Sequence, residues 1–297
     1  MPRMIAPAAT TYRGALTQPE RWAIWQPREG DILVCTPPKS GTTWTQSMLA
    51  MLRYGGPDLP DRLGAISPWV DGDLGVSSAE VARTIDALPG RRILKTHTPA
   101  DGFPVYDGVT VVAVYRHPLD LFFSLRKHIA NRHVDGDHPM NAPVSQALAH
   151  LLNAPMRKDA FDDDTLDGIT HHYIQTVLSG RLPNLITLHY ADMLNDPRAA
   201  LRHLAEATGL GADDALIEAV AEATAIQQMR GKAEQYAPVG GTGFLRSDAA
   251  FFATGGTRNW EGQLSQEDLE AYRTRLAALL PDESARQWLE NGSGTSL

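Results

Sequence analysis

Three short segments of the sequence combine cationic and hydroxyl side chains in patterns that suit anion chemistry. The segment VCTPPKSGTTWTQSML contains Lys39 and Gly41, followed by two threonines, Thr42 and Thr43. A glycine permits a tight turn, and backbone N–H groups at a helix start bind anions, although a plain Pro/Gly turn before a capped helix is the alternative. The standard triphosphate loop, G-x-x-x-x-G-K-[ST], has its lysine after the last glycine, whereas here the lysine comes first. The segment therefore predicts a phosphate-binding loop whose ligand differs from the usual nucleoside triphosphate.

The segment VYRHPLDLFFSL indicates a second phosphate contact. Arg116 stands at the end of an apolar β-type run, and Ser124 follows eight residues later, a little over two helical turns. If a helix begins near Pro118, the guanidinium and the hydroxyl can grip one phosphate together, the arginine through two hydrogen bonds. A purely structural reading is compatible with this, because Pro118 and Asp120 also favour a helix start.

The segment LKTHTP predicts an acid–base group. Lys95 and His97 are two residues apart in a β-type run, so their side chains point to the same side of the strand. A histidine titrates near neutral pH and suits removal of a proton from a hydroxyl. A nearby lysine neutralises charge on a group that is being transferred. We therefore expect His97 to be a general base and Lys95 to stabilise charge.

The elements that position these segments alternate between β-type runs and helical patterns. Apolar runs end at Cys35 and occupy residues 91–97, 109–115 and 184–190, and helical or turn patterns follow them. This alternation predicts an α/β fold with a mostly parallel central sheet flanked by helices. Ligands of such sheets bind beyond the carboxyl ends of the strands, which is where the three segments lie.

The chain is predicted to form a single domain over residues 1–297. Its core is expected at about residues 20–290, with a flexible N-terminal segment and C-terminal tail. Residues 130–168 are rich in Asp, His, Pro and Asn and predict a surface excursion or lid. Residues 232–259 predict a glycine-rich loop over a ligand, and two helices split by Pro281 are expected near the end.

Composition excludes several classes of function. Hydrophobic residues make up 43% and charged residues 21%, as in ordinary globular proteins, and the formal net charge of −8 argues against non-specific nucleic-acid binding. Without an apolar signal segment or a run of roughly 18 apolar residues, a cytoplasmic protein with no membrane span is expected. One cysteine, Cys35, excludes an internal disulfide, and His128, His133, His138, His171 and His172 show no ligand spacing, so no metal is expected.

Together the three segments resemble the cytosolic-type sulfotransferases that use 3′-phosphoadenosine 5′-phosphosulfate (PAPS). PKSGTTW is similar to that family's 5′-phosphosulfate loop, YRHPLDLFFS to its 3′-phosphate segment and KTHTP to the strand with its base. Order and spacing also match, over about residues 20–265. The resemblance implies a P-loop-like 5′-phosphosulfate-binding loop and transfer of a sulfonate group from PAPS to a hydroxyl or amine. The product would be 3′-phosphoadenosine 5′-phosphate (PAP), and no metal is implied.

The resemblance also implies roles for individual residues. Lys39 would bond the sulfonate or bridging oxygens, Lys95 would stabilise the same charge, and His97 would take the acceptor proton. The 5′-phosphate would be wrapped by Ser40, Gly41, Thr42 and Thr43. Arg116 and Ser124 would bind the 3′-phosphate, and Ser124 would restrain Lys39 until the acceptor binds. The adenine would be contacted by Trp44, Tyr190, Thr224, Ile226 and Met229, with Ile226 where the family usually has phenylalanine.

One segment, FFATGGTRNW, departs from the family pattern F-x-R-K-G-x-x-G-D-W. Gly255 is kept, but Ala253 and Thr254 replace the two cations that clamp the 3′-phosphate. A charge-assisted hydrogen bond contributes about 1.5–3 kcal/mol, so we expect weaker cofactor binding unless another cation takes part. Arg258 is the expected substitute, and Arg246 is a second candidate.

Two other functions stay open at the level of sequence. A nucleotide or small-molecule kinase would need Mg²⁺ ligands and a lysine directly after Gly41, where this chain has threonine. A PAPS- or PAP-binding protein with weak activity is favoured by the lost cations, but opposed by the intact Lys39, Lys95 and His97.

The sequence does not specify the acceptor, which can be a phenol, an alcohol, a lipid or a natural product. Its pocket is expected from residues 65–80, 130–165 and 235–252, with Phe123 and Phe251 as candidate walls. The family's C-terminal dimer motif is not apparent, so no oligomeric state is predicted.

Overall fold

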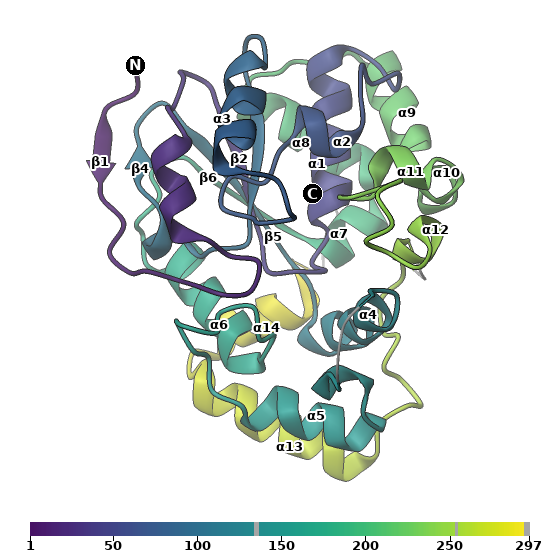
Figure 1. Ribbon diagram of the computed structural model, residues 1–297. Helices are drawn as coiled ribbons and strands as arrows, with labels where there is room; N and C mark the ends of the chain where they lie inside the picture. The colour runs from purple at the N-terminus through teal and green to yellow at the C-terminus, as the bar shows by residue number, and fades with distance from the viewer. Residues whose placement is uncertain (134–136, 253–254, 294–297) are drawn as a thin grey trace.

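Parallel strands form the central sheet. We describe residues 1–133, 137–252 and 255–293 of a computed structural model of the chain. Within them the sheet contains β2 (Ile32–Cys35), β3 (Ile93–Thr96), β5 (Thr110–Tyr115) and β6 (Leu185–His189), in the order β3-β2-β5-β6. All three pairings are parallel. The predicted parallel sheet is therefore confirmed, and its strands coincide with the apolar runs of the sequence (Figure 1).

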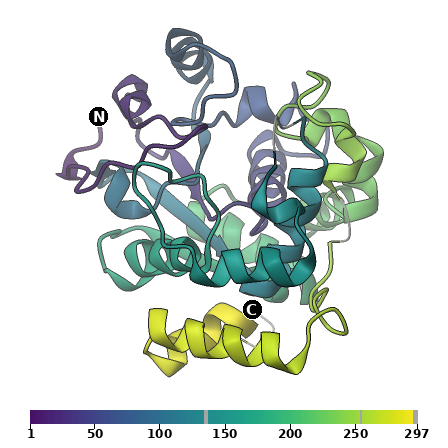
Figure 2. The same cartoon turned by 60° about the horizontal axis from the view of Figure 1, so that its bottom comes forward.

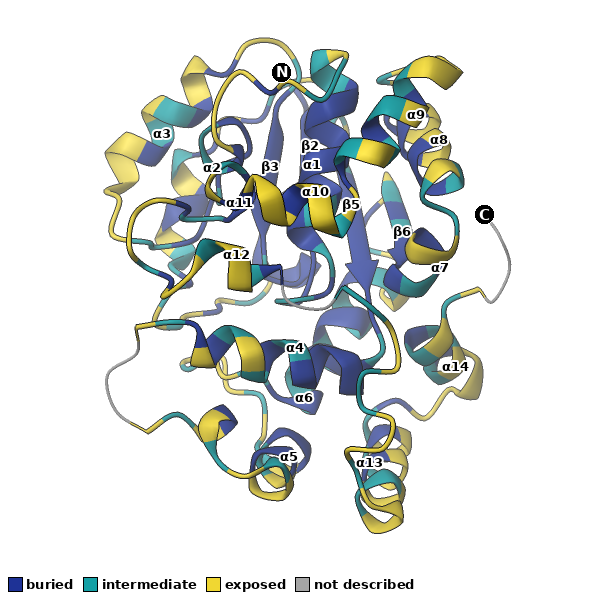
Figure 3. Cartoon of the chain, turned by 90° about the vertical axis from the view of Figure 1, so that its right-hand side faces the viewer, coloured by how far each residue is buried: buried dark blue, intermediate teal, exposed yellow. Residues whose placement is uncertain are grey.

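Both faces of the sheet are buried. One face is covered by α1 (Thr42–Tyr54), α8 (Pro197–Thr208) and α9 (Asp214–Ala223), and the other by the 3-10 helix η1 (Pro19–Ile24), α3 (Ser78–Ala87) and β4 (Val105–Tyr106). Along β2, Ile32 and Val34 belong to the first core, and Leu33 and Cys35 belong to the second. Burial on both faces explains why the strand is apolar at every position. In Figure 3, β2 and β3 are accordingly coloured as buried.

Further helices form a group beyond the carboxyl ends of the strands. They are α4 (Pro118–Ala130), α5 (Val144–Asn153), α6 (Leu166–Tyr173), α13 (Gln266–Leu279) and α14 (Glu283–Asn291). Figure 2 shows the C-terminal helices, in yellow, lying along the teal helices of this group. Because Leu148 and Leu151 on α5 are buried in its core, residues 144–153 are a core element and not the expected surface excursion.

Shorter elements connect these layers. They are α2 (Leu63–Ile66), η2 (Ala100–Gly102), η3 (Pro139–Asn141), the π-helical η4 (Ile174–Leu178), α7 (Tyr190–Asn195), α10 (Ile226–Gly231), α11 (Ala233–Tyr236) and α12 (Asp248–Phe251). The glycine-rich loop expected at residues 232–259 thus includes two short helices. None of the helices in the described ranges is long and apolar enough to cross a membrane.

The N-terminal segment, expected to be flexible, lies against the body of the protein. Its strand β1 (Met4–Ala6) pairs antiparallel with β4. Tyr12 is buried, and its hydroxyl donates to the Asp101 carboxylate at 2.8 Å and 2.9 Å from the two oxygens. Tyr12 anchors the segment, because its apolar ring is buried and its hydroxyl has a hydrogen-bond partner. The far end of the expected C-terminal tail, residues 294–297, lies outside the described residues.

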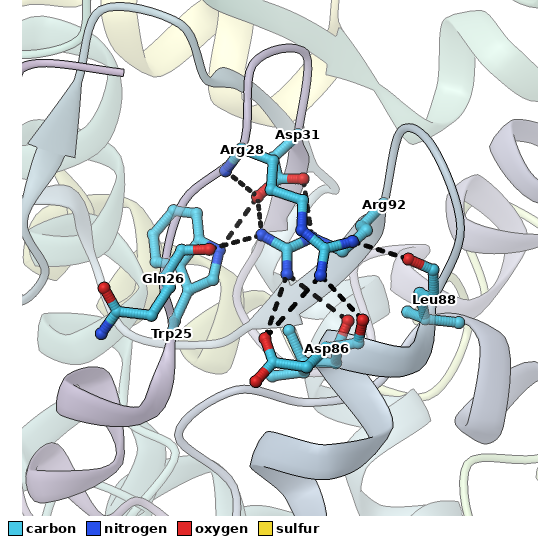
Figure 4. A network of polar contacts seen from close by, with 8 residues as sticks. Trp25, Gln26, Arg28, Asp31, Asp86, Leu88 and Arg92 are labelled. Atoms are coloured by element: carbon cyan, nitrogen blue, oxygen red, sulfur yellow. Dashed lines mark hydrogen bonds and ion pairs between the residues drawn. The ribbon is translucent and has the colours of Figure 1, made fainter. Parts of the chain in front are cut away.

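A buried ion pair holds the beginnings of β2 and β3 together. The Asp31 and Arg92 side chains have no exposed surface, and the Arg92 guanidinium donates to both carboxylate oxygens at 2.9 Å and 2.5 Å. Trp25 Nε1 and the Arg28 backbone N–H also donate to this carboxylate, at 3.1 Å and 2.9 Å (Figure 4). Asp31 and Arg92 directly precede the paired residues Ile32 and Ile93. The pair therefore fixes the relative position of the two strands.

We predict that Asp31→Asn lowers the free energy of unfolding by about 3–5 kcal/mol, because the buried Arg92 charge then keeps only the half-exposed Asp86 carboxylate, at 3.8 Å. Urea unfolding followed by circular dichroism measures this change. Asp214→Asn is the matched control, because it removes an ion pair with Arg202 that is exposed on both sides. Equal effects of the two substitutions would contradict the role assigned to the buried pair.

Candidate active site

The loop after β2 has an unusual backbone that only some residues adopt. Lys39 has a φ of 63° and Gly41 a φ of 114°, and Gly41 caps the start of α1. A Cβ atom at Gly41 would lie 3.0 Å from the Tyr190 ring, so the position requires glycine for space as well as for conformation. Ser40, between these two residues, is buried, and its Oγ has no hydrogen-bond partner among the described residues.

This loop forms part of the wall of a cavity with a volume of about 680 Å³. The sequence-predicted residues that line the cavity are Lys39, Gly41, Thr42, Thr43, Trp44, Lys95, His97, Arg116, Ser124, Tyr190, Thr224, Ile226, Met229 and Gly255. They come from the carboxyl ends of β2, β3 and β5, from α4, and from the segments at residues 190, 224–229 and 255. The parallel sheet thus brings together residues that are far apart in the sequence, as expected for a site at this edge.

Cationic side chains crowd one side of the cavity. Lys39 Nζ lies 3.7 Å from the centre of the Phe251 ring, and Lys95 Nζ lies 4.3 Å from that of Trp69. Burial, together with the charges of Arg116 and Lys95, lowers the pKa of Lys39 to about 7. Burial also lowers the pKa of Lys95 to about 8, against the opposing effect of Asp71. Neither ammonium group forms an ion pair with a carboxylate in the described part of the chain, and an anion bound here would stabilise their charged forms.

Arg116 joins the end of β5 to the loop. Its Nη2 donates to the Gly256 carbonyl at 2.7 Å and its Nη1 to the Lys39 carbonyl at 3.4 Å. The guanidinium carbon lies 4.5 Å from the centre of the Tyr190 ring. Its Nε is buried and has no hydrogen-bond acceptor among the described residues. An unpaired donor on a buried cation is the arrangement expected where an anion binds.

The tautomer of His97 follows from its neighbour. His97 Nδ1 lies 2.7 Å from the Thr36 carbonyl oxygen, which can only accept a hydrogen bond. Nδ1 therefore carries the proton, and Nε2 carries the lone pair that can accept one. The ring packs edge-on against Trp69 at 4.9 Å between centroids. Burial and the Lys95 charge lower the pKa of His97 well below its usual value, so the imidazole is neutral near pH 7.

Aromatic and aliphatic side chains form an apolar end of the cavity. The rings of Trp44 and Tyr190 meet edge to face at 5.4 Å. A Cβ atom at Gly255 would lie 2.9 Å from Ile226, so this glycine permits the close approach of two segments. The hydroxyl of Thr224 donates to the Val220 carbonyl at 2.8 Å, so its proton is already used in a hydrogen bond at the end of α9. These surfaces suit a flat, apolar ring system next to the cationic region.

Two predicted contact residues do not line the cavity. Ser40 is buried within the loop, and Arg258 points outward with a side chain that is 73% exposed and 3.7 Å from Glu261. Its orientation has a physical cause, because buried Asp120 accepts the backbone N–H groups of Arg258 and Asn259 at 2.9 Å and 2.7 Å. In this structure the Arg258 side chain thus lies away from the cavity, and its expected role at the 3′-phosphate stays a prediction. Ala253 and Thr254 lie outside the described residues.

The cavity also contains residues that sequence reasoning did not single out. The regions expected to form the acceptor pocket contribute Trp69, Leu74, Arg132, Phe161, Asp164, Val239 and Phe244 to the lining, next to the candidate wall Phe251. Phe123, a candidate wall, is instead buried in the core around α4. Arg132 and Asp164 had no motif around them, so only their folded positions reveal them. In the described residues, no group of three or more His, Cys, Asp or Glu side chains is placed to hold a metal ion.

The chain matches a known protein family over most of its length. A family model described as a sulfotransferase domain matches residues 29–282. The glycolipid sulfotransferase of Mycobacterium tuberculosis is 31% identical, with 92% of this chain and 91% of that protein covered. Human sulfotransferase 1C2 is 23% identical over 73% of both chains.

Solved structures share the fold. A mouse sulfotransferase complexed with PAP has a TM-score of 0.70 at 15% identity, covering 93% of this chain and 94% of that one. A retinol dehydratase in complex with retinol and PAP has a TM-score of 0.69 at 18% identity, covering 86% and 83%. The P-loop-like arrangement predicted for the phosphate loop is that of these structural neighbours.

We predict that His97 remains neutral, with its proton on Nδ1, at pH 6.5. The ¹⁵N chemical shifts of histidine-labelled protein report this state, with exposed His203 as a reference resonance. Lys95→Met should move the pKa of His97 upward, because it removes a neighbouring positive charge that disfavours protonation. Observation of an Nε2–H tautomer or of an imidazolium at pH 6.5 would refute the assignment.

Proposed function

We propose that this chain, which belongs to the sulfotransferase domain family, uses His97 as the base that removes the acceptor proton. The protein is a PAPS-dependent sulfotransferase that moves a sulfonate group to a small-molecule acceptor and releases PAP. This assignment removes the kinase and the non-catalytic nucleotide-binding protein as alternatives. The observation that carries the proposed role is the hydrogen bond between His97 Nδ1 and the Thr36 carbonyl, because it leaves Nε2 as a proton acceptor.

The cavity suits a nucleotide with phosphate groups at both ends of its ribose. Arg116 Nε is a buried donor without a partner among the described residues, it lines the cavity, and it belongs to the segment that resembles the 3′-phosphate site. A buried polar group left without a partner costs about 1–3 kcal/mol, which a bound anion would relieve. Lys39 and Lys95 add charge, and Trp44 and Ile226 offer surfaces for the adenine.

The proposed residue roles follow from these positions. When bound, PAPS supplies the sulfonate, whose bond to the 5′-phosphate oxygen breaks as a bond to the acceptor oxygen forms. His97 Nε2 takes the proton of the acceptor hydroxyl. Lys39 stabilises the electron pair left on the bridging oxygen, and Lys95 stabilises charge on the transferring group. Ser124 and Arg116 hold the 3′-phosphate.

Lys127 is the residue that we propose in place of Arg258 for the 3′-phosphate. It lines the cavity and follows Ser124 by three residues on α4, so both lie on the same side of the helix. Side chains of a helix lean toward its N-terminus, which directs Lys127 toward Ser124. A lysine here would supply one of the two cations that residues 253 and 254 lack.

The acceptor is proposed to carry a hydroxyl group on a partly apolar molecule. The relative from Mycobacterium tuberculosis is named a glycolipid sulfotransferase, and a structural neighbour binds retinol. Phe161, Phe244 and Val239 line the same cavity as His97 and provide apolar surface for such a molecule. A cytoplasmic location remains a prediction from the sequence.

We predict that His97→Ala lowers kcat by roughly 10²–10⁴-fold, because a general base is lost, while the Kd for PAP stays unchanged. A PAP-release assay with a panel of hydroxyl acceptors measures turnover, and calorimetry measures binding. For the wild type, the acid limb of kcat/KM should lie below pH 6.5, since the lowered pKa of His97 keeps the base unprotonated there. His203→Ala, at an exposed position on α8, is the control, and near-wild-type turnover of His97→Ala would disprove the role.

Lys127→Met should weaken PAP binding about 10-fold, equivalent to about 1.4 kcal/mol, and leave the binding of 5′-AMP unchanged. The two nucleotides differ only in the 3′-phosphate, so the difference isolates that contact. Exposed Lys158, which does not line the cavity, provides the matched control Lys158→Met. Equal losses for both nucleotides, or no loss for PAP, would count against the assignment.

A further inference from the structure

The cavity contains a pair of charged side chains that the proposed sulfonate transfer does not use. Arg132 follows α4 and Asp164 precedes α6, and both line the cavity together with Phe161 and Phe244. The charges of the two residues influence each other's pKa, so they lie near each other in the fold. No ion pair joins their side chains in the described part of the structure.

Asp164 differs from the two aspartates before it. Asp162 accepts hydrogen bonds from Thr17, at 3.1 Å from the backbone N–H and 2.6 Å from the hydroxyl, so it is occupied in holding the N-terminal segment. Asp163 is exposed. The Asp164 carboxylate accepts no hydrogen bond from any described residue, although burial and the Asp162 charge raise its pKa to about 7. Asp164 is therefore a carboxylate in the cavity lining that no hydrogen-bond donor of the described residues contacts.

Arg132 supplies the complementary group. Its Nε is buried and has no acceptor among the described residues. The guanidinium carbon lies 5.1 Å from the centre of the Phe244 ring, which fixes one face of the group. A carboxylate without a donor and a guanidinium without an acceptor therefore line one cavity. A hydrogen-bond donor on a ligand would satisfy the carboxylate, and an acceptor would satisfy the guanidinium.

We propose that Asp164 and Arg132 recognise adjacent hydroxyl groups on a neutral, polyhydroxylated acceptor head such as a sugar ring. A hydroxyl group both donates and accepts, so neighbouring hydroxyls satisfy the carboxylate and the guanidinium at once. A charged head is less suitable, because Arg132 repels a cation and Asp164 repels an anion. Phe161 and Phe244 provide flat surfaces for the apolar faces of the ring and for an attached chain.

This inference rests on the proposed function, and a matched pair of acceptors tests it. Octyl glucoside and octanol share the alkyl chain, but only the glucoside carries a ring of neighbouring hydroxyls. We expect the wild type to prefer the glucoside in kcat/KM, measured as PAP release by mass spectrometry. A site built to hydrogen-bond a hydroxyl discriminates strongly against a molecule without it.

Asp164→Asn should lower kcat/KM for octyl glucoside about 10- to 100-fold and leave that for octanol nearly unchanged. Arg132→Gln should act in the same direction, which guards against a folding defect in one variant. Asp159→Asn is the matched control, because it removes the same charge from an exposed side chain that does not line the cavity, and it should change kcat/KM for neither acceptor. Binding of PAP, followed by thermal shift, should be the same in all of these proteins.

Other outcomes overturn the inference. If Asp164→Asn lowers kcat/KM equally for both acceptors, Asp164 does not recognise the head group. If the wild type turns over octanol without preferring the glucoside, the inference fails and the proposed function stands. If the wild type binds PAP but releases no PAP from PAPS with either acceptor, the class of acceptor is wrong both in this inference and in the proposed function.

Discussion

The hydrogen bond between His97 Nδ1 and the Thr36 carbonyl is the interaction on which the site depends. At 2.7 Å it ties the end of β3 to the beginning of the phosphate loop after β2. It also decides which ring nitrogen carries the proton, and therefore which one can take a proton from an acceptor. The same backbone segment leads to Lys39, so one contact fixes both the base and the group that stabilises the leaving oxygen.

That contact is possible only because the strands beneath it are rigidly aligned. The Asp31–Arg92 pair holds the starts of β2 and β3, and their parallel register places Cys35 opposite Thr96, so Thr36 and His97 follow at the same level. Beyond the strand ends, Lys39, Lys95 and Arg116 lie close together, and none of them forms an ion pair with a described carboxylate. Burial lowers the pKa values of both lysines, and the charges of Arg116 and Lys95 lower that of Lys39 further. The free protein thus holds unfavourable positive charge that an anionic co-substrate relieves.

The sequence predicted most of this end of the cavity, because the residues sit in compact motifs at the ends of apolar runs. A parallel sheet brings such ends together without any further information. The remainder depended on contacts between distant segments. Asp120 turns the loop so that Arg258 faces solvent, and no local pattern around Arg258 reveals this. Asp164 and Arg132 likewise become candidates for the site only because the fold brings the segments before α6 and after α4 to one cavity. The buried face of α5 was missed because its polar flanks dominated the surrounding composition.

A structure of the protein with PAP and an acceptor bound measures the central geometry directly. We predict that the reacting oxygen of the acceptor lies about 2.6–3.2 Å from His97 Nε2 while Nδ1 keeps its contact with the Thr36 carbonyl. An acceptor oxygen that instead contacts another side chain, with the His97 ring turned away from Thr36, would contradict it.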